Sequence, residues 1–148
     1  MSLLASLLPE NHVLLDVEIT SKKRLFEYIG LLFENSHGIS SGTVFDSLFA
    51  REKLGSTGLG QGIAIPHGRI KGLKEASGAF VRLAQPLPFE APDGRPVQLI
   101  FALLVPEQAT EQHLQILSEL AQRFSEREFR EKLAAASERA EVRQAFAD

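Results

Sequence analysis

Residues 99–105 form an unbroken apolar run, Leu-Ile-Phe-Ala-Leu-Leu-Val. Successive side chains of a strand point to opposite faces, so a strand that is apolar at every position has to be covered on both faces. The run is also far too short to cross a bilayer as a helix. We therefore expect a central β-strand with helices packed on both sides of its sheet, which limits the chain to the α/β class.

Helical and strand patterns alternate along the chain without an internal repeat or a low-complexity linker, which predicts a single domain over residues 1–148. Strands are expected at residues 61–65, 78–84 and 97–105. Residues 86–96 contain four prolines and an Asp-Gly turn, which indicates a surface excursion or a short edge strand. Together these elements predict a mixed sheet.

Apolar residues at helical spacing predict two amphipathic helices in the first third of the chain. The first follows Ser21 and ends near residues 35–38, and the second opens at Ser41. The apolar face of the second helix comprises Val44, Phe45, Leu48 and Phe49.

Three more helices are expected after the central strand. Thr110 is expected to cap the first of them, Ser125 with Glu128 forms a capping-box pattern for the next, and Ser137 is expected to open the last. The predicted apolar stripe of the first helix comprises Leu114, Leu117, Leu120, Ala121 and Phe124.

Length and composition narrow the class of protein. With 148 residues and 44% hydrophobic content, the chain can bury a sizeable core without disulfides or a metal. The formal net charge is -3, and no cluster of Lys and Arg is larger than residues 22–24, so a nucleic-acid partner is not expected. We expect residues 22–24 to form a solvated first helical turn.

Other classes are disfavoured by what the sequence lacks. It has no cysteine, which excludes disulfides and thiolate chemistry and fits a reducing compartment. The first residues lack the positive region of a signal peptide, so we expect a cytoplasmic protein without direct membrane insertion. Four histidines without His-Glu-x-x-His spacing make a metal site unexpected, and the glycines fit no nucleotide motif. No cofactor is therefore expected.

A β-branched apolar run stops at a proline that is followed by a histidine and a glycine. Ile63 and Ile65 favour an extended, buried backbone, whereas Pro66 cannot donate to a ladder and is expected to end the strand. Gly68 is expected to leave room for a bulky group beside the imidazole. The pattern presents His67 as a surface nucleophile, although an ordinary turn histidine has the same local sequence.

The segment before His67 has the features of an anion site. Its glycines at positions 55, 58, 60 and 62, together with Ser56 and Thr57, could surround an anion with exposed amides and hydroxyls. Arg51 and Arg69 bracket the segment in sequence. Alternatively, Arg51 pairs with a nearby glutamate, Arg69 serves partner docking, and the two hydroxyls only shape the turn.

A second histidine, His113, stands at the third position of the helix expected after Thr110. The unpaired amides and positive dipole of a helix N-terminus disfavour a cation and attract anions, so the imidazole is expected to be neutral. The alternative is a first-turn histidine that merely faces solvent.

One stretch of the chain resembles the phosphohistidine signature of one class of proteins. It runs from Glu52 through Leu59-Gly60 to the sequence Ala-Ile-Pro-His-Gly at 64–68. These proteins are the enzyme IIA domains of the mannitol/fructose/nitrogen class of the phosphotransferase system. A second block, residues 93–97 with the strand that follows and His113-Leu114, is similar as well. The resemblance covers roughly residues 14–124 and implies the mannitol-type enzyme IIA fold, a mixed sheet sandwiched between helices.

The resemblance also implies a mechanism. His67 matches the nucleophile that accepts a phosphoryl group from a small histidine phosphocarrier protein, and His113 matches its phosphoryl-stabilising partner. Such a transfer needs alignment and neutralisation of the phosphoryl oxygens, because its transition state is loose and rich in charge. Arg51, Thr57 and Arg69 are the further candidates for binding phosphate, and no metal is required.

The amino-acid sequence of residues 41–60 is most similar to that of the nitrogen-regulatory subgroup. For that subgroup the resemblance implies regulation of partners, such as potassium-transport or sensor-kinase components, according to phosphorylation state. A sugar-specific enzyme IIA that passes phosphate to a IIB cysteine is the alternative within the class. A non-catalytic interaction module is the alternative outside it.

Overall fold

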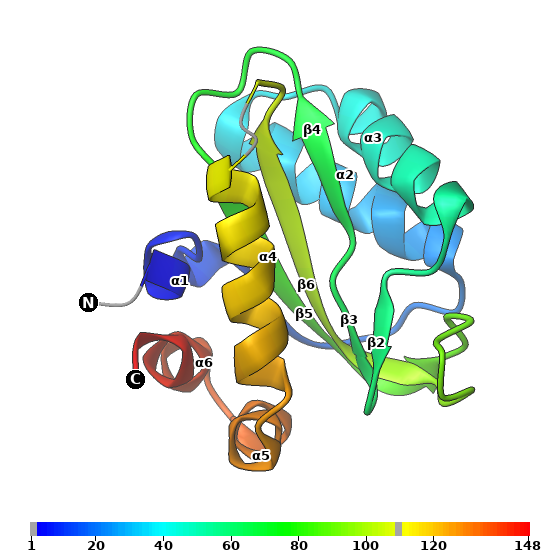
Figure 1. Ribbon diagram of the computed structural model, residues 1–148, viewed down its shortest axis with the longest axis vertical. Coiled ribbons are helices and arrows are strands. Elements are labelled where there is room, and N and C mark those ends of the chain that lie inside the picture. The colour runs from blue at the N-terminus through cyan, green and yellow to red at the C-terminus, as the bar shows by residue number, and fades with distance from the viewer. Residues whose placement is uncertain (1–2, 109–110) are drawn as a thin grey trace.

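The computed structural model describes residues 3–108 and 111–148 as one mixed β-sheet with helices on both faces (Figure 1). The strands are β1 (Val13–Val17), β2 (Gly58–Gly60), β3 (Ile63–Ala64), β4 (His67–Ile70), β5 (Ser77–Leu87) and β6 (Val97–Pro106). The α-helices are α1 (Leu3–Ser6), α2 (Lys22–His37), α3 (Ser41–Leu54), α4 (Glu111–Phe124), α5 (Arg127–Ala135) and α6 (Arg139–Ala147), and residues Glu10–His12 form a short 3-10 helix.

The six strands are arranged around β6. The order is β1-β5-β6-β3-β2, and β4 pairs with β6 as well. Strand β5 is antiparallel to β6, whereas β3 and β4 are parallel to it. The predictions of a mixed sheet and of a central strand over the apolar run are confirmed.

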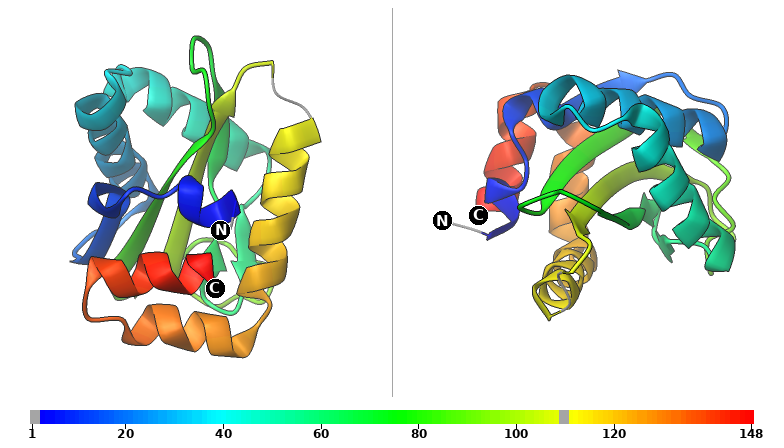
Figure 2. Two further views of the ribbon diagram at one scale, coloured as in Figure 1. Left: turned by 90° about the vertical axis from the view of Figure 1, so that its left-hand side faces the viewer. Right: turned by 90° about the horizontal axis from the view of Figure 1, so that it is seen from above.

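Side chains of β6 alternate between two cores. Leu99, Phe101 and Leu103 pack in the core under α1, α4, α5 and α6, whereas Ile100 and Ala102 pack in the core under α2 and α3. Figure 2 shows the two groups of helices on opposite faces of the sheet. This is the expected sandwich, and it explains why the run is apolar at every position.

The N-terminal helices begin close to where the sequence predicts. The side chain of Ser21 accepts a hydrogen bond from the amide of Arg24 at 3.1 Å and caps α2, which ends at Gly38 in the left-handed conformation. Helix α3 begins at Ser41, as predicted. Its residues Val44 and Leu48 are fully buried.

The predicted stripe of α4 is right at Leu120 and Phe124, which are buried, and wrong at Leu114 and Ala121, which are exposed. The buried side chains are His113, Ile116, Leu120 and Phe124, whereas Leu114 is 65% exposed. The predicted and observed sets share Leu120 and Phe124, and the ring of Phe124 contacts Phe129 of α5 and Phe146 of α6. The first turns of the helix instead bury His113 and Ile116. The expected cap, Thr110, lies outside the described residues.

The capping-box prediction at Ser125 is also wrong. Its hydroxyl donates to the carbonyl of Gln122 at 2.6 Å, so it completes the end of α4 instead of starting α5. Near the last helix, the hydroxyl of Ser137 donates to Glu141 at 2.7 Å, and α6 begins two residues after Ser137.

Three strands were not predicted: β1, and the two strands β2 and β4 that lie on either side of β3 in the sequence. The proline-rich residues 86–96 were expected to form a surface excursion or a short edge strand. The segment also contributes to the core, because Phe89 is fully buried under α2 and α3. Among the described residues, no helix is long and apolar enough to span a membrane.

Candidate functional site

Strands β3 and β4 are two halves of one strand that is interrupted at Pro66. Ile63 lies opposite Leu99 and His67 lies opposite Leu103, which is the same offset of 36 positions on both sides of the interruption. Pro66 has no amide hydrogen, yet its carbonyl accepts from the amide of Leu103 at 2.9 Å. The proline therefore interrupts the strand and does not end it, and His67 is a strand residue rather than a turn residue.

The break orients the imidazole of His67. Its Nδ1 lies 2.9 Å from the carbonyl oxygen of Ile65, and a carbonyl can only accept, so Nδ1 carries the hydrogen. The other ring nitrogen, Nε2, then retains its lone pair. His67 is only partly buried, so the residue lies at the surface of the protein.

His113 lies beside His67. The two ring centroids are 5.8 Å apart and the rings are inclined at 65°. The strand alternation directs His67 to the α4 side of the sheet, and the rotation of α4 turns His113 inward to meet it. His113 is only 8% exposed, so the alternative of a solvent-facing first-turn histidine is wrong.

The loop after α3 is held by a buried carboxylate. Glu52 is 7% exposed and accepts from the amide and the hydroxyl of Thr57, the latter at 2.6 Å. It also pairs with Lys22 at 2.8 Å. The expectation of a solvated first turn over residues 22–24 is therefore wrong at its first position. Lys22 and Glu52 are supporting residues that sequence reasoning did not assign, although Glu52 opens the signature.

The remaining predicted residues have distinct environments. Nη1 of Arg51 donates to the carbonyl of Gly55 at 2.8 Å, and within the described residues its guanidinium pairs with no carboxylate. Arg69 lies on the same face of β4 as His67 and donates to the carbonyl of Glu107 at 3.3 Å. The hydroxyl hydrogen of Thr57 goes to Glu52, so its described contact shapes the loop.

Gly68 has a different role from the one expected. A Cβ at this position would collide with the side chain of Ser47 and lie 3.0 Å from its Cβ atom. The glycine therefore allows α3 to approach β4 closely, and it does not create space beside the imidazole. This close approach positions α3, which carries Arg51, against the strand that carries His67.

Electrostatics favour the neutral form of His67. Burial lowers the pKa of His67 below the ordinary value of 6.5, the hydrogen bond to Ile65 raises it in part, and the positive charge of Arg51 lowers it further. At neutral pH the ring is therefore uncharged and nucleophilic at Nε2. Among the described residues, no cluster of three or more His, Asp or Glu side chains could hold a metal ion.

We expect the ring of His67 to titrate with a midpoint below 6.5. Because its pKa is lower in the folded than in the unfolded protein, its contribution to the free energy of unfolding declines as the pH falls below about 6.5. An NMR titration of the Cε1 proton, assigned by comparison with His67→Ala, measures this midpoint. A midpoint at or above 6.5 would contradict the electrostatic description.

Replacement of Glu52 by Gln is expected to lower the free energy of unfolding by about 2 kcal/mol, because it removes charged hydrogen bonds to Lys22 and Thr57. The matched control is Glu90→Gln, since Glu90 contacts the same lysine at 3.3 Å from an 87% exposed position. That control is expected to lose less than about 1 kcal/mol. Urea denaturation measures both, and equal losses would show that the buried carboxylate has no special role.

A family model described as "Phosphoenolpyruvate-dependent sugar phosphotransferase system, EIIA 2" matches residues 6–148. The chain belongs to this enzyme IIA family. The matched region includes all strands of the sheet and both histidines of the site.

Curated relatives within the enzyme IIA family are named for nitrogen regulation. The chain is 43% identical over 134 residues to a nitrogen regulatory protein of Pseudomonas aeruginosa, covering 90% of this chain and 87% of the relative. It is 42% identical over 133 residues to a nitrogen regulatory protein of Escherichia coli K12, covering 89% of this chain and 82% of the relative.

Solved structures of enzyme IIA proteins agree with the fold. The nitrogen regulatory protein IIA-Ntr of Neisseria meningitidis superposes with a TM-score of 0.94 at 57% identity, covering 98% of this chain and 99% of that one. The mannitol IIA protein of Escherichia coli superposes with a TM-score of 0.77 at 20% identity, covering 93% and 97%. The expected mannitol-type fold is confirmed.

Proposed function

We propose that this protein accepts a phosphoryl group on Nε2 of His67 from a small histidine phosphocarrier protein. The observation that carries the proposal is the hydrogen bond from Nδ1 to the carbonyl of Ile65, which leaves Nε2 with its lone pair. Membership of the enzyme IIA family supports the same chemistry.

The transfer is a displacement at phosphorus. The lone pair of Nε2 attacks the phosphorus atom, a new P–N bond forms to His67, and the P–N bond to the donor imidazole breaks with its electron pair left on the donor nitrogen. The phosphorylated ring of His67 becomes positively charged, and the carbonyl of Ile65 stabilises that charge through the retained Nδ1 hydrogen. No external acid, base or metal is needed.

The phosphoryl oxygens need positive charge and hydrogen-bond donors. We assign these roles to His113, whose ring lies beside that of His67, and to Arg51, whose charge acts on the His67 ring. Arg69 is a further candidate, since it shares the face of β4 with His67. We assign to Thr57 the role of holding the loop after α3 in place through its hydrogen bond to Glu52. Direct contact between Thr57 and the phosphoryl group is an additional prediction.

Exposed apolar side chains support transfer between proteins. Leu54, Leu59 and Leu114 are 85%, 45% and 65% exposed, and they belong to the segments that supply Arg51, Thr57 and His113. Exposed apolar groups around a polar centre are typical of a surface that another protein covers. We infer that the phosphocarrier docks here.

The decisive experiment mixes the protein with phosphoenolpyruvate, enzyme I and the histidine carrier and records the intact mass. The expected result is the gain of one acid-labile phosphoryl group, which NMR locates on Nε2. A mass that does not change while the carrier itself is phosphorylated would overturn the proposal, and modification at Nδ1 would overturn the assignment of the nucleophile.

Substitution of His113 by Ala is expected to slow phosphorylation of His67 by about tenfold to a thousandfold, because one donor to the developing charge is lost. Its neighbour Leu114 offers a matched control on the same helix, since Leu114→Ser tests docking without removing the imidazole. Rapid-quench measurement of the phosphorylation rate of each variant distinguishes a loss of chemistry from a loss of docking. A His113→Ala protein that folds normally and reacts at the wild-type rate would remove His113 from the site.

The biological role that we propose is regulatory, because relatives at 42–43% identity are named nitrogen regulatory proteins. On this proposal the phosphorylation state controls cytoplasmic partners, of which potassium-transport and sensor-kinase components are candidates. A fructose-specific EIIA component of Haloferax volcanii, 39% identical over 103 residues, favours the sugar-specific alternative. Transfer of labelled phosphate from His67 to a IIB cysteine would support that alternative, and its absence supports regulation.

A further inference from the structure

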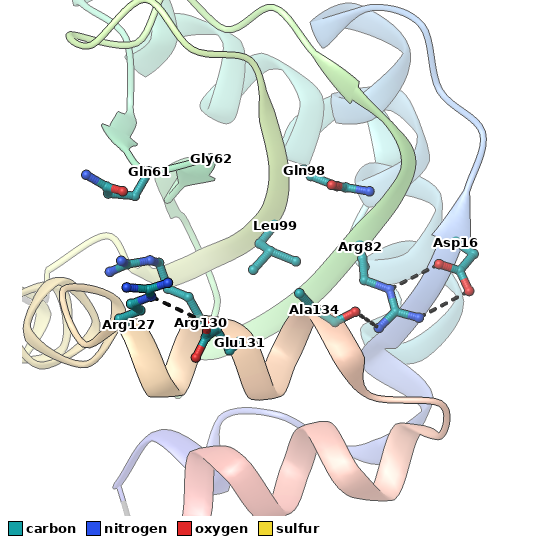
Figure 3. A pocket seen from close by; sticks show the side chains of 10 residues that line it. All are labelled: Asp16, Gln61, Gly62, Arg82, Gln98, Leu99, Arg127, Arg130, Glu131 and Ala134. Carbon is teal, nitrogen blue, oxygen red and sulfur yellow. Dashed lines mark hydrogen bonds and ion pairs between the residues drawn. The ribbon is translucent and has the colours of Figure 1, made fainter.

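A cavity of about 410 Å³ lies between the tip of the β2–β3 hairpin, the start of β6 and helix α5 (Figure 3). This volume lies within the range of pockets that hold small molecules. The described residues that line it include neither His67 nor His113, so the cavity is distinct from the site proposed above.

One end of the cavity is a fixed wall. Arg82 is 8% exposed, pairs with Asp16 through two hydrogen bonds of 3.0 and 3.1 Å, and donates to carbonyls at the end of α5. Figure 3 shows this pair closing one side of the pocket. Because these contacts occupy the guanidinium, Arg82 shapes the cavity and contributes little binding capacity.

The opposite end carries positive charge with little compensation. Arg127 and Arg130 lie there together, below Gln61 in Figure 3. Arg127 has an 83% exposed side chain and pairs with Glu131 at 3.4 Å. Arg130 donates to the carbonyl of Phe124 at 2.8 Å and has no carboxylate partner within the described residues. Two guanidinium groups thus face one carboxylate.

Between the two ends are amides and an apolar surface. The side chain of Gln98 donates to the carbonyl of Leu83 at 2.9 Å, which leaves its amide oxygen as an acceptor. The side chain of Gln61 makes no hydrogen bond in the part of the chain that the structure describes, and Leu99 supplies an apolar floor. A few polar groups over an apolar floor are typical of small-molecule sites.

Two residues with a positive φ angle line the same cavity. Asp16 and Gln61 have φ angles of 57° and 58°, and they are two of the three non-glycine residues with positive φ in the described chain. At Gln61 the positive angle belongs to the two-residue turn that joins β2 to β3, in which Gly62 has a φ of 80°. The turn is held in place by Asp93, which accepts a hydrogen bond from the Gln61 amide at 2.9 Å, so this wall of the cavity has a defined shape.

From these observations we propose that the cavity binds a small organic anion. Arg127 and Arg130 bind its carboxylate or phosphate group, Gln61 and Gln98 bind a neighbouring polar group, and Leu99 contacts a short apolar part. The inference stands apart from the proposed function, because binding requires no phosphoryl transfer.

The cavity is connected to His67 through the backbone. The carbonyl of Gly62 accepts from the amides of Gln98 and Leu99 at 2.9 and 3.1 Å, and β3 leads from Gly62 to Ile65, whose carbonyl orients His67. A ligand that moves Gln61 therefore also moves β3, and through β3 the carbonyl of Ile65 that holds the imidazole of His67. We expect occupancy of the cavity to change the environment of His67.

The test is a titration of the ¹⁵N-labelled full chain with succinate and, separately, with inorganic phosphate at constant ionic strength. Saturable shifts are expected at the amides of Gln61, Gly62 and Gln98, followed by the ring of His67. A stronger response to succinate identifies a carboxylate ligand, and a stronger response to phosphate identifies a phosphate-bearing one. Shifts that sodium chloride reproduces would overturn the proposal.

Variants make the assignment specific. Arg127→Gln and Arg130→Gln are each expected to weaken binding by about tenfold, the effect of losing a charged hydrogen bond. Because Arg130 also contacts α4, Arg127→Gln is the variant that leaves the fold unaffected. The matched control is Arg24→Gln, an arginine on α2 that is 77% exposed and paired with Glu27. Equal affinities for Arg127→Gln, Arg24→Gln and the wild type would overturn the site, and an unshifted His67 ring at saturation would overturn the coupling.

Discussion

A His67→Ala protein is expected to take up no phosphoryl group from the phosphorylated carrier, with incorporation at the background of the assay. The substitution removes Nε2, the nitrogen whose lone pair the hydrogen bond to Ile65 leaves available. His113 is buried and lies to the side, with its ring centroid 5.8 Å from that of His67.

The fold should survive this substitution. His67 is half-buried and its described hydrogen bond is the one to Ile65, so the free energy of unfolding should change by no more than about 1.5 kcal/mol. His37→Ala is a suitable control, because His37 is an exposed histidine at the end of α2. Intact-mass measurement and thermal denaturation of both variants test the pair. Phosphorylation of His67→Ala at the wild-type level would eliminate the proposed function.

The largest expected effect on stability is that of Phe146→Ala. Phe146 is fully buried in α6, and its ring contacts Phe80 and Phe101 of the sheet and Phe124 and Phe129 of the neighbouring helices, with centroid distances of 5.0–6.1 Å. Removal of such a side chain leaves a cavity and costs about 3–5 kcal/mol. The melting temperature should fall by roughly 10 °C.

The control for this prediction is Phe45→Ala. Phe45 is partly buried on α3 and stacks on Phe49 at 5.4 Å, so its removal opens no enclosed cavity. We expect a loss of less than about 1.5 kcal/mol for this variant. Denaturant melts of the two variants give the comparison. Equal losses would mean that the aromatic cluster around Phe146 is not the centre of the core.

Features that depend on local chemistry were predictable from the sequence. The apolar run at 99–105 could be stable only as a covered central strand, and the structure has it as β6. Ser21 followed by a helical pattern and ended by Gly38 defined α2 nearly to the residue. In both cases the residues that determine the element lie within it or beside it, so no tertiary information was needed.

The sequence was enough to propose the residues of the candidate site but not its architecture. The signature pointed to His67 and His113, and the structure places their rings side by side. The same signature did not reveal that Pro66 interrupts a strand without ending it, because the pairing partner is Leu103 on a distant strand. Lys22 was misread for a similar reason, since its carboxylate partner is Glu52 on another helix.

The sequence by itself determined the fold class and the central strand, and it pointed to the two histidines of the candidate site. Only the tertiary structure decided which face of α4 is buried, why position 68 is glycine and which ring nitrogen of His67 keeps its lone pair. The first two features depend on contacts between segments that are remote in sequence. The third is a hydrogen bond between residues two positions apart, at the interruption between β3 and β4, which both pair with the distant strand β6. Local pattern restricts what an element can be, whereas its rotation, its close approaches and its long-range hydrogen bonds are set only when the elements pack together.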